Sequence, residues 1–481
     1  MSKDIGITVK KNENFSEWYT QVILKAQLAD YAPIKGFIVV MPYGYSIWEK
    51  IKEYLDKKIK ETGHKNAYFP ALIPESLLRK EAEHFKGFTP EVFWVTHAGD
   101  TELSEKYAIR PTSETIVYES YAKWVRSWRD LPIRLNFWNS VFRAEIKSTK
   151  PFIRTSEFLW QEGHTVHATK EEAEEEVMLM LNVYKELIQD YLAIPVIEGK
   201  KSEREKFLGA LYTATLEAIM PDGKALQMGT SHNLGENFSR SFGIKYIGKD
   251  EKEHYAWQTC WGVSWRLIGA MVMAHGDDRG LVLPPKIAPI QAIIIPIIYK
   301  DVNKTEILSK AKKVLDELQN HGISALLDDR DQYTPGWKFH EWELKGIPVR
   351  IEIGPKDLQD RCITISRRDT FERITIKDEE LINRMLKLLD EIQSNLFNKA
   401  KKLLEEHITV AYDYSQFIEI LENKGGFIKA CWCGRTECED KIKEETGATI
   451  RVIPFKTEKV FSSCIYCKKE AKEVVYFAKA Y

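Results

Sequence analysis

A predicted β-hairpin between residues 136 and 167 carries side chains suited to binding a nucleotide. Its first strand ends in the run Phe142-Arg143-Ala144-Glu145. Its second strand carries four side chains spaced two apart, which therefore share one face: Phe158, Trp160, Glu162 and His164. An arginine fork donates two parallel hydrogen bonds to phosphate oxygens, and a phenyl ring offers a flat face to a base. The hairpin therefore predicts a nucleotide site, with the carboxylate and imidazole available to hold a small polar ligand.

The loop at the tip of this hairpin is basic, with Lys147, Lys150 and Arg154. Each polar group of the hairpin, taken alone, is also explained as a hydrogen-bonded residue on a sheet surface. The combination with a basic loop favours the binding site. The sequence contains neither the G-x-x-x-x-G-K-[ST] phosphate loop nor a G-x-G-x-x-G turn after a strand. A nucleotide would therefore have to bind on the antiparallel hairpin itself.

A second group of reactive side chains lies near the C-terminus. Cys433 and Cys438 are separated by four residues, and Cys464 and Cys467 by two, with 25 residues between the pairs. Four thiolates in this spacing are typical of a tetrahedral structural zinc site. Reduced thiols without a metal are the alternative, and Cys431 is a possible substitute ligand.

Composition excludes several classes of protein. Seven cysteines without a secretion signal argue against a disulfide framework. The longest apolar run, residues 292–298, contains Pro296 and is too short to span a bilayer. We therefore expect a cytoplasmic protein with no membrane contact. The net charge of −1 is a weak argument against a nucleic-acid partner, because a balanced total can hide a basic face.

Several elements must position the hairpin. Ser46 and Glu49 predict a capping box for a helix over residues 46–62, and a second helix should follow Thr112 or Ser113. Thr169 and Glu172 predict another capping box, opening a helix that runs to about Tyr191. Helices and largely antiparallel strands thus mix up to about residue 285.

A regular α/β pattern follows the run Leu283-Pro284-Pro285. We expect strands at 291–298, 324–328, 349–353 and 362–366, with helices at 305–320 and 337–345 and a long helix at 377–406. The predicted fold class is therefore a multidomain α/β and α+β protein. Its domains are an antiparallel-sheet domain (1–285), an α/β domain (286–400) and a small zinc-binding α/β domain (401–481).

Longer motifs identify a family. The chain resembles the prolyl-tRNA synthetases of the archaeal and eukaryotic type, within class II of the aminoacyl-tRNA synthetases, over nearly its whole length. The motifs that carry the resemblance lie at residues 44–70, 110–114, 141–145, 158–164, 262–269, 275–278 and 281–285. Trp265 departs from the pattern, where a smaller residue is expected, which affects the shape of the pocket wall.

The resemblance implies activation of L-proline by ATP with Mg²⁺, followed by transfer to tRNA(Pro), and assigns roles by position. Arg143 and Arg266 would be the catalytic pair, with Arg143 gripping the α-phosphate and the substrate carboxylate. The ATP site would also include Glu145, Phe158, Gln227, Thr230 and Ser264, with Phe158 and Arg266 sandwiching the adenine. Proline would contact Thr112 and Glu114 through its amine, and Trp160, Glu162, His164 and His232 around its ring.

The resemblance extends to the remaining domains. It makes residues 286–400 an anticodon-binding domain in which Glu343, Arg350, Lys356 and Asp357 read guanine edges. It favours Cys433 over Cys431 as a zinc ligand, and implies a homodimer. About a hundred residues separate the second and third motifs, too few for the editing insertion of bacterial relatives. A threonyl-type class II enzyme or a non-catalytic paralogue that binds tRNA are the alternatives.

Overall fold

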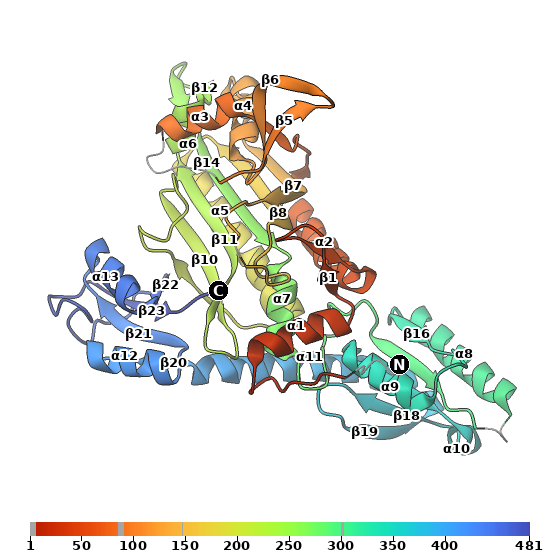
Figure 1. The fold of residues 1–481 in the computed structure, drawn as a ribbon. Helices are drawn as coiled ribbons and strands as arrows, with labels where there is room; N and C mark the ends of the chain where they lie inside the picture. Colours follow the sequence, from red (N-terminus) through yellow and green to blue (C-terminus); the bar gives the residue numbers. More distant parts are fainter. Residues whose placement is uncertain (1–5, 85–90, 147, 300–302) are drawn as a thin grey trace.

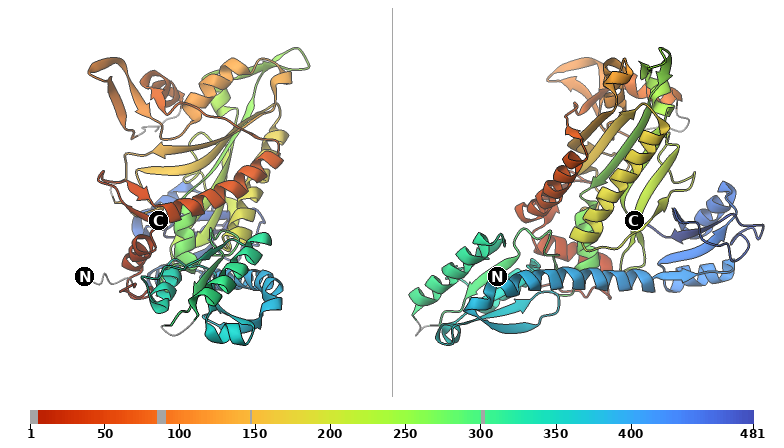
Figure 2. Two further views of the ribbon diagram at one scale, coloured as in Figure 1. Left: turned by 90° about the vertical axis from the view of Figure 1, so that its right-hand side faces the viewer. Right: turned by 180° about the vertical axis from the view of Figure 1, so that it is seen from behind.

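The computed structural model describes residues 6–84, 91–146, 148–299 and 303–481. The expected fold class is confirmed: an N-terminal domain built on an antiparallel sheet, a middle α/β domain and a small C-terminal α/β domain (Figure 1). The long helix α11 (Leu381–Glu406) runs along the base of the molecule and joins the last two (Figure 2). The predicted domain boundary at residue 400 therefore falls inside a helix.

One eleven-stranded sheet passes through both the N-terminal and the C-terminal domains, in the order β20-β21-β23-β22-β9-β10-β11-β14-β8-β7-β3. The strands of the N-terminal domain are β3 (Lys65–Asn66), β7 (Ile133–Phe142), β8 (Glu157–His167), β9 (Ile197–Lys200), β10 (Tyr212–Ile219), β11 (Ala225–Gly235) and β14 (Trp257–Ser264). Those of the C-terminal domain are β20 (Ile408–Val410), β21 (Phe427–Trp432), β22 (Thr449–Pro454) and β23 (Glu473–Ala478). Neighbours from β9 to β7 are antiparallel, as expected for this domain.

The two domains join where β22 pairs with β9, through Ile453 opposite Lys200 and Pro454 opposite Gly199. A Cβ added at Gly199 would lie 2.2 Å from the carbonyl oxygen of Ile453. Only glycine therefore allows the two strands to approach at this point.

Among the described residues, four helices cover one face of the N-terminal sheet, whereas α4 (Glu114–Trp124) and α6 (Asn237–Phe242) pack on only part of the other, the open face. The covering helices are α1 (Phe15–Lys25), α2 (Pro42–Glu61), α5 (Lys170–Glu186) and α7 (Arg266–His275). Their apolar sides form the main core with the back of the sheet, and the aromatic residues of α1, Trp18 and Tyr19, are completely buried there. The hydroxyl of Thr169 accepts a hydrogen bond from the Glu172 amide, as the capping box predicted. A π-helical turn (Leu187–Tyr191) then extends α5 to the predicted end.

The predicted start of the first long helix is wrong. Helix α2 begins at Pro42, and Ser46 lies inside it, with its hydroxyl donating to the carbonyl oxygen of Tyr43 at 2.7 Å. Proline suits the first helical position because the amide hydrogen that it lacks would have no partner there. Ser46 therefore does not cap the start of α2, because its side chain bonds to the backbone within the helix.

Smaller elements complete the N-terminal domain. They are β1 (Ala29–Tyr31), β2 (Ile38–Val40), β4 (Leu72–Pro74), α3 (Glu75–His84), β5 (Trp94–Ala98), β6 (Thr101–Ile109), α4 (Glu114–Trp124), a 3₁₀ turn (Trp128–Asp130), α6 (Asn237–Phe242), β12 (Lys245–Ile247) and β13 (Glu253–Tyr255). The predicted helix after Ser113 is α4. Residues 168–256 form α5, three strands of the sheet, α6 and the small β12-β13 hairpin, so no separate domain is inserted between β8 and β14.

The middle domain has a five-stranded sheet in the order β16-β15-β17-β18-β19. Its elements are β15 (Ala292–Pro296), α8 (Lys304–Asn320), β16 (Ala325–Leu327), α9 (Pro335–Leu344), β17 (Val349–Ile353), α10 (Pro355–Gln359), β18 (Cys362–Arg367) and β19 (Arg373–Lys377), then a 3₁₀ turn (Asp378–Glu380). Helix α10 and strand β19 were not predicted. Because 373–377 pair with β18, the long helix starts at Leu381 rather than Lys377.

The C-terminal domain adds α12 (Tyr414–Asn423) and α13 (Thr436–Thr446) to its four strands. Across the described residues, none of the helices combines the length and the apolar character that crossing a membrane requires.

Candidate active site

The predicted site residues lie in register on the open face of the N-terminal sheet. On three adjacent strands, His164 of β8 is opposite Cys260 of β14, which is opposite His232 of β11. The next row joins Glu162, Gly262 and Thr230 in the same way. Since residues opposite each other on antiparallel strands share a face, the sheet gathers side chains that are up to 96 residues apart in sequence, as His164 and Cys260 are.

A buried acid–imidazole pair forms the floor of the pocket. His164 Nε2 is 3.0 Å from Glu162 Oε2, and Asn139 donates to Glu162 Oε1 at 2.9 Å, where Ser113 also donates. Tyr118 Oη lies 3.0 Å from His164 Nδ1. Burial disfavours both charges, but the mutual hydrogen bond and attraction lower the pKa of Glu162 and raise that of His164. Their contact therefore favours the ionised form of Glu162 and the protonated form of His164.

Glu114 stands at the first position of α4, with its carboxylate accepting a hydrogen bond from Thr112. Burial raises the pKa of Glu114, and the charge of Glu162 adds to this, although His164 opposes it. Cys260 lies beside Glu114 and His164, with one potential ligand atom from each within 4.8 Å of the others. A second buried carboxylate thus faces the pocket next to the acid–imidazole pair.

His232 closes one side of the pocket as a neutral ring. Its Nδ1 is 2.8 Å from Thr213 Oγ1, and its ring packs against Phe207. Burial, assisted by the charge of His164, lowers the pKa of His232 to about 3.

Two half-buried guanidinium groups lie at the other end of the site. Arg143 lies over the ring of Phe158, 5.2 Å from its centroid. Burial lowers the pKa of Arg143, while the charges of Glu145, Glu114 and Glu162 oppose the shift. The structure therefore brings Arg143 within electrostatic reach of both pocket carboxylates. Glu145 itself is exposed, and Lys147 of the hairpin loop lies outside the described residues.

Arg266 is also half-buried, and desolvation together with the charge of Arg143 lowers its pKa to about 10. One of its terminal nitrogens donates to the carbonyl oxygen of Ile153 at 3.3 Å, while its Nε has no hydrogen-bond partner among the described residues. A buried donor without a partner is uncommon and marks a position where a ligand can bind. Ser264 Oγ accepts from the Arg266 amide at 3.3 Å, which ties the start of α7 to β14.

The four residues expected to read guanine edges lie at two places in the middle domain. Glu343 of α9 and Arg350 of β17 form an ion pair of 2.8 Å, and Phe339 stacks on the Arg350 guanidinium at 4.0 Å. Lys356 is exposed on α10, beyond the other end of β17, and Asp357 there accepts a hydrogen bond from the Gly354 amide. At about 3.3 Å per residue, the two places are roughly 15–20 Å apart.

The structure also brings the four predicted cysteines together: Cys433, Cys438, Cys464 and Cys467. The Sγ atom of Cys433 lies 3.6 Å from that of Cys438 and 3.8 Å from that of Cys467. Tetrahedral zinc with bonds of about 2.3 Å requires sulfur atoms about 3.8 Å apart, so the donor set fits the ion. Cys431 is not in the group, since its sulfur instead accepts from the Phe461 amide at 3.4 Å.

Sequence reasoning did not identify Ser113, Tyr118 and Asn139, which hold Glu162 and His164 in place. Asn139 lies opposite Trp160 on β7 and accepts from its indole, a contact that strand pairing alone could have suggested. Tyr118 lies on α4, and its contact with His164 depends on how that helix packs across the sheet.

Comparisons with known proteins agree with this architecture. Residues 93–275 match the family "tRNA synthetase class II core domain (G, H, P, S and T)", residues 291–388 the "Anticodon binding domain" and residues 414–481 "Prolyl-tRNA synthetase, C-terminal". The proline–tRNA ligase of Cenarchaeum symbiosum is 55% identical over 99% of this chain and 100% of its own. Proline–tRNA ligase 2 of Clostridioides difficile is 54% identical over 98% of this chain and 97% of its own.

A solved structure is also similar over its whole length. The prolyl-tRNA synthetase of Cryptosporidium parvum, in a complex with halofuginone and AMPPNP, has a TM-score of 0.95, with 43% identity and full coverage of both chains. Identity above 50% along nearly the entire sequence, with three matching domain families in the same order, leaves one conclusion: the chain belongs to the prolyl-tRNA synthetase family.

Proposed function

We propose that this chain is a proline–tRNA ligase: it activates L-proline with ATP and transfers the prolyl group to tRNA(Pro). The observation that carries the proposal is the group of side chains itself, where two buried carboxylates, Glu114 and Glu162, lie within electrostatic reach of the half-buried Arg143. Proline is a zwitterion with a compact ring. Its ammonium has two N–H donors that suit the carboxylates, and its carboxylate suits the arginine fork.

The first step is attack by the proline carboxylate on the α-phosphorus of ATP, with pyrophosphate as the leaving group. Arg143 would bind the carboxylate and the α-phosphate together, which holds nucleophile and electrophile in line. The charge that develops on the phosphate oxygens would be stabilised by Arg143 and Arg266, whose positions are set before the substrate binds. The second step is transfer of the prolyl group to a ribose hydroxyl at the end of the tRNA.

The remaining residues of the open face would hold the nucleotide. Phe158 would stack on the adenine, Glu145 would lie near its edge, and Gln227, Thr230 and Ser264 would line the rest. Magnesium, which binds largely through phosphates, would supply further charge neutralisation when bound. Gln227 and Thr230 would offer oxygen ligands to the magnesium ion.

Selection of proline would come from the pocket walls, Thr112, Trp160, His164 and His232. Pocket size alone separates ligands of similar volume by only about 1–3 kcal/mol. Cysteine is therefore the competitor that the pocket is least able to reject, and no domain between β8 and β14 offers an editing site.

The middle domain would read the anticodon through two places, Glu343 with Arg350 and Lys356 with Asp357. Their separation suits two adjacent or splayed guanines, with a guanidinium or ammonium for the O6 and N7 acceptors and a carboxylate for the amino group. In the C-terminal domain, Cys433, Cys438, Cys464 and Cys467 would hold a structural zinc ion.

A homodimer, in the cytoplasm, completes the proposal. Large apolar side chains that stay exposed concentrate between residues 31 and 94, around β1, β2, the start of α2 and the segments after it: Tyr31, Ile34, Val39, Tyr45, Tyr68, Leu72 and Trp94. Contiguous exposed apolar surface is typical of a protein interface.

The decisive experiment is amino-acid-dependent exchange of pyrophosphate into ATP, with proline, cysteine, alanine and threonine compared. We expect exchange with proline, abolished by Arg143→Ala and retained in Arg129→Ala, a matched change at an exposed arginine. Exchange with threonine alone would support the threonyl-type alternative. Folded protein that exchanges with no amino acid would contradict the proposal and leave the binding paralogue.

A further inference from the structure

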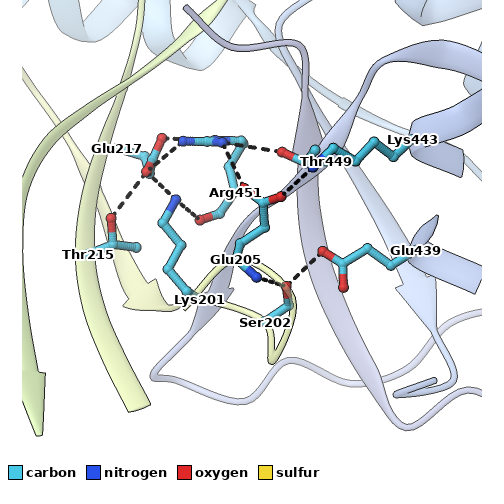
Figure 3. Close-up of polar contacts among 9 residues, drawn as sticks. All are labelled: Lys201, Ser202, Glu205, Thr215, Glu217, Glu439, Lys443, Thr449 and Arg451. Carbon is cyan, nitrogen blue, oxygen red and sulfur yellow. Dashed lines mark hydrogen bonds and ion pairs between the residues drawn. The ribbon is translucent and has the colours of Figure 1, made fainter. Parts of the chain in front are cut away.

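A buried cluster of charges lies where the C-terminal domain joins the N-terminal sheet (Figure 3). We define the Glu217 cluster as Glu217 and Thr215 of β10, Lys201 just after β9, and Arg451 of β22. The first three belong to the N-terminal domain, whereas Arg451 reaches in from the C-terminal domain. All four are at most 8% exposed.

The carboxylate of Glu217 is the acceptor for the whole cluster. It receives a hydrogen bond from Lys201 Nζ at 2.5 Å, from Arg451 Nε and Nη2 at 3.2 Å each, and from the Thr215 hydroxyl at 3.1 Å. Lys201 also donates to the backbone carbonyl of Arg451 at 3.1 Å, which binds the two strands directly. Removing Glu217, Lys201 or Arg451 would leave a buried charge with fewer partners, which is strongly unfavourable.

Glu217 is ionised in this setting. Burial opposes the charge, but Lys201 and Arg451 outweigh it and lower the pKa of Glu217. Burial also lowers the pKa of Lys201 to about 8. A carboxylate with two cationic partners and a hydroxyl donor is held in a single orientation.

The cluster borders the proposed ATP site. Glu217 is directly opposite Gln227 on β11, and Thr215 is opposite Thr230, so each shares the open face with a residue proposed to line that site. The negative charge of Glu217 also acts on Arg266, whose buried Nε is without a partner among the described residues. None of the residues proposed for the ATP site belongs to the Glu217 cluster.

We infer that Glu217 is a positioning residue of the ATP site, held by Lys201 and Arg451, and that the C-terminal domain, through Arg451, completes that site. The inference rests on the proposed function. Glu217 acts through its neighbours: it fixes the strand that carries Gln227 and Thr230, and it supplies a counter-charge that keeps Arg266 oriented while its Nε stays available for substrate. The C-terminal domain is then part of the nucleotide site, in addition to being a support for zinc.

The test compares Arg451→Met with Lys443→Ala in pyrophosphate exchange, with ATP and proline varied separately. Lys443 makes an ion pair of 3.1 Å with Glu205 across the same domain junction, but is half exposed and does not contact Glu217. We expect Arg451→Met to raise the KM for ATP about tenfold, because it removes one of the two cations that neutralise buried Glu217 next to the site. The KM for proline should change less than about twofold in both variants, and Lys443→Ala should leave both KM values and kcat near wild type.

A merely structural role of Arg451 would lower the thermal midpoint and kcat without a selective rise in the KM for ATP, and that result would overturn the inference. Thr215→Val, which removes one hydrogen bond from Glu217 and no charge, keeps the test valid if Arg451→Met does not fold. It should raise the KM for ATP about threefold, and an unchanged value would also overturn the inference. Failure of the proposed function is separate, because the wild-type chain would then show no exchange.

Discussion

Replacing Glu114 by glutamine should weaken proline binding while sparing ATP binding. The carboxylate lies at the first position of α4, buried, with Thr112 and the Glu162–His164 pair around it. Glutamine keeps the shape and one acceptor oxygen but removes the negative charge that faces the proposed ammonium group. A hydrogen bond to a charged partner contributes about 1.5–3 kcal/mol, which corresponds to about a 10- to 150-fold rise in the KM for proline.

The assay is pyrophosphate exchange with proline varied at saturating ATP, then ATP varied at saturating proline. The KM for ATP should stay within about twofold of wild type, because Glu114 lies beside His164 and Cys260, whereas Thr230 belongs to the next row of the sheet. Glu157→Gln is the matched control, since it makes the same change on β8 but on the opposite face from Glu162.

The helix itself supplies a second check. An acidic residue in the first turn of a helix stabilises it by about 0.3–1 kcal/mol through the helix dipole. Loss of this interaction in Glu114→Gln should therefore lower the unfolding free energy by no more than about 1 kcal/mol. Thermal unfolding measures it. A variant that is folded and keeps a wild-type KM for proline would refute the reasoning, because it would show that the amine binds elsewhere.

Three further predictions concern the zinc cluster, one buried acid and one domain contact. Purified protein should contain one zinc ion per chain by atomic absorption. The Cys467→Ser variant should lose the zinc and have a lower thermal midpoint, whereas the Cys431→Ser variant should retain it. Absence of zinc from the wild-type protein would exclude the site. Glu439, buried against Ser202, has a pKa raised to about 7. The native state therefore holds this proton at higher pH than the unfolded chain does. Protonated Glu439 thus contributes at most about 3 kcal/mol of stability, which is fully present below about pH 4.5 and is lost as the pH rises to about 7. Glu439→Gln should remove this slope in urea unfolding at pH 5 and pH 8, and an unchanged slope would place the titration elsewhere. Arg368 of the middle domain makes a bidentate contact of 2.6 Å with Asp277 of the N-terminal domain; Asp277→Asn should therefore slow tRNA charging while pyrophosphate exchange stays near wild type, and an equal loss in both assays would argue against a role in coupling the domains.

The sequence by itself predicted the candidate site residues and much of the local structure. Alternation along 158–164 placed four side chains on one face, and Thr169 marked the start of α5 with a capping signal that the structure confirms. The cysteine spacing predicted a four-sulfur group, and the α/β pattern after Pro285 matched most elements of the middle domain. These features depend on residues close together in the chain, where periodicity and capping are informative.

Only the tertiary structure decided which distant residues meet. It placed Arg143 over Phe158, Cys260 beside Glu114 and His164, and Arg451 on Glu217, 234 positions away in the chain. It also joined the C-terminal strands to the N-terminal sheet through Gly199 and Pro454. Strand order and register between remote segments are set by packing of whole faces and by points of close approach, and no local pattern encodes them. The residues that hold the active site in place were therefore hidden in the sequence, while the residues expected to perform the chemistry were visible in it.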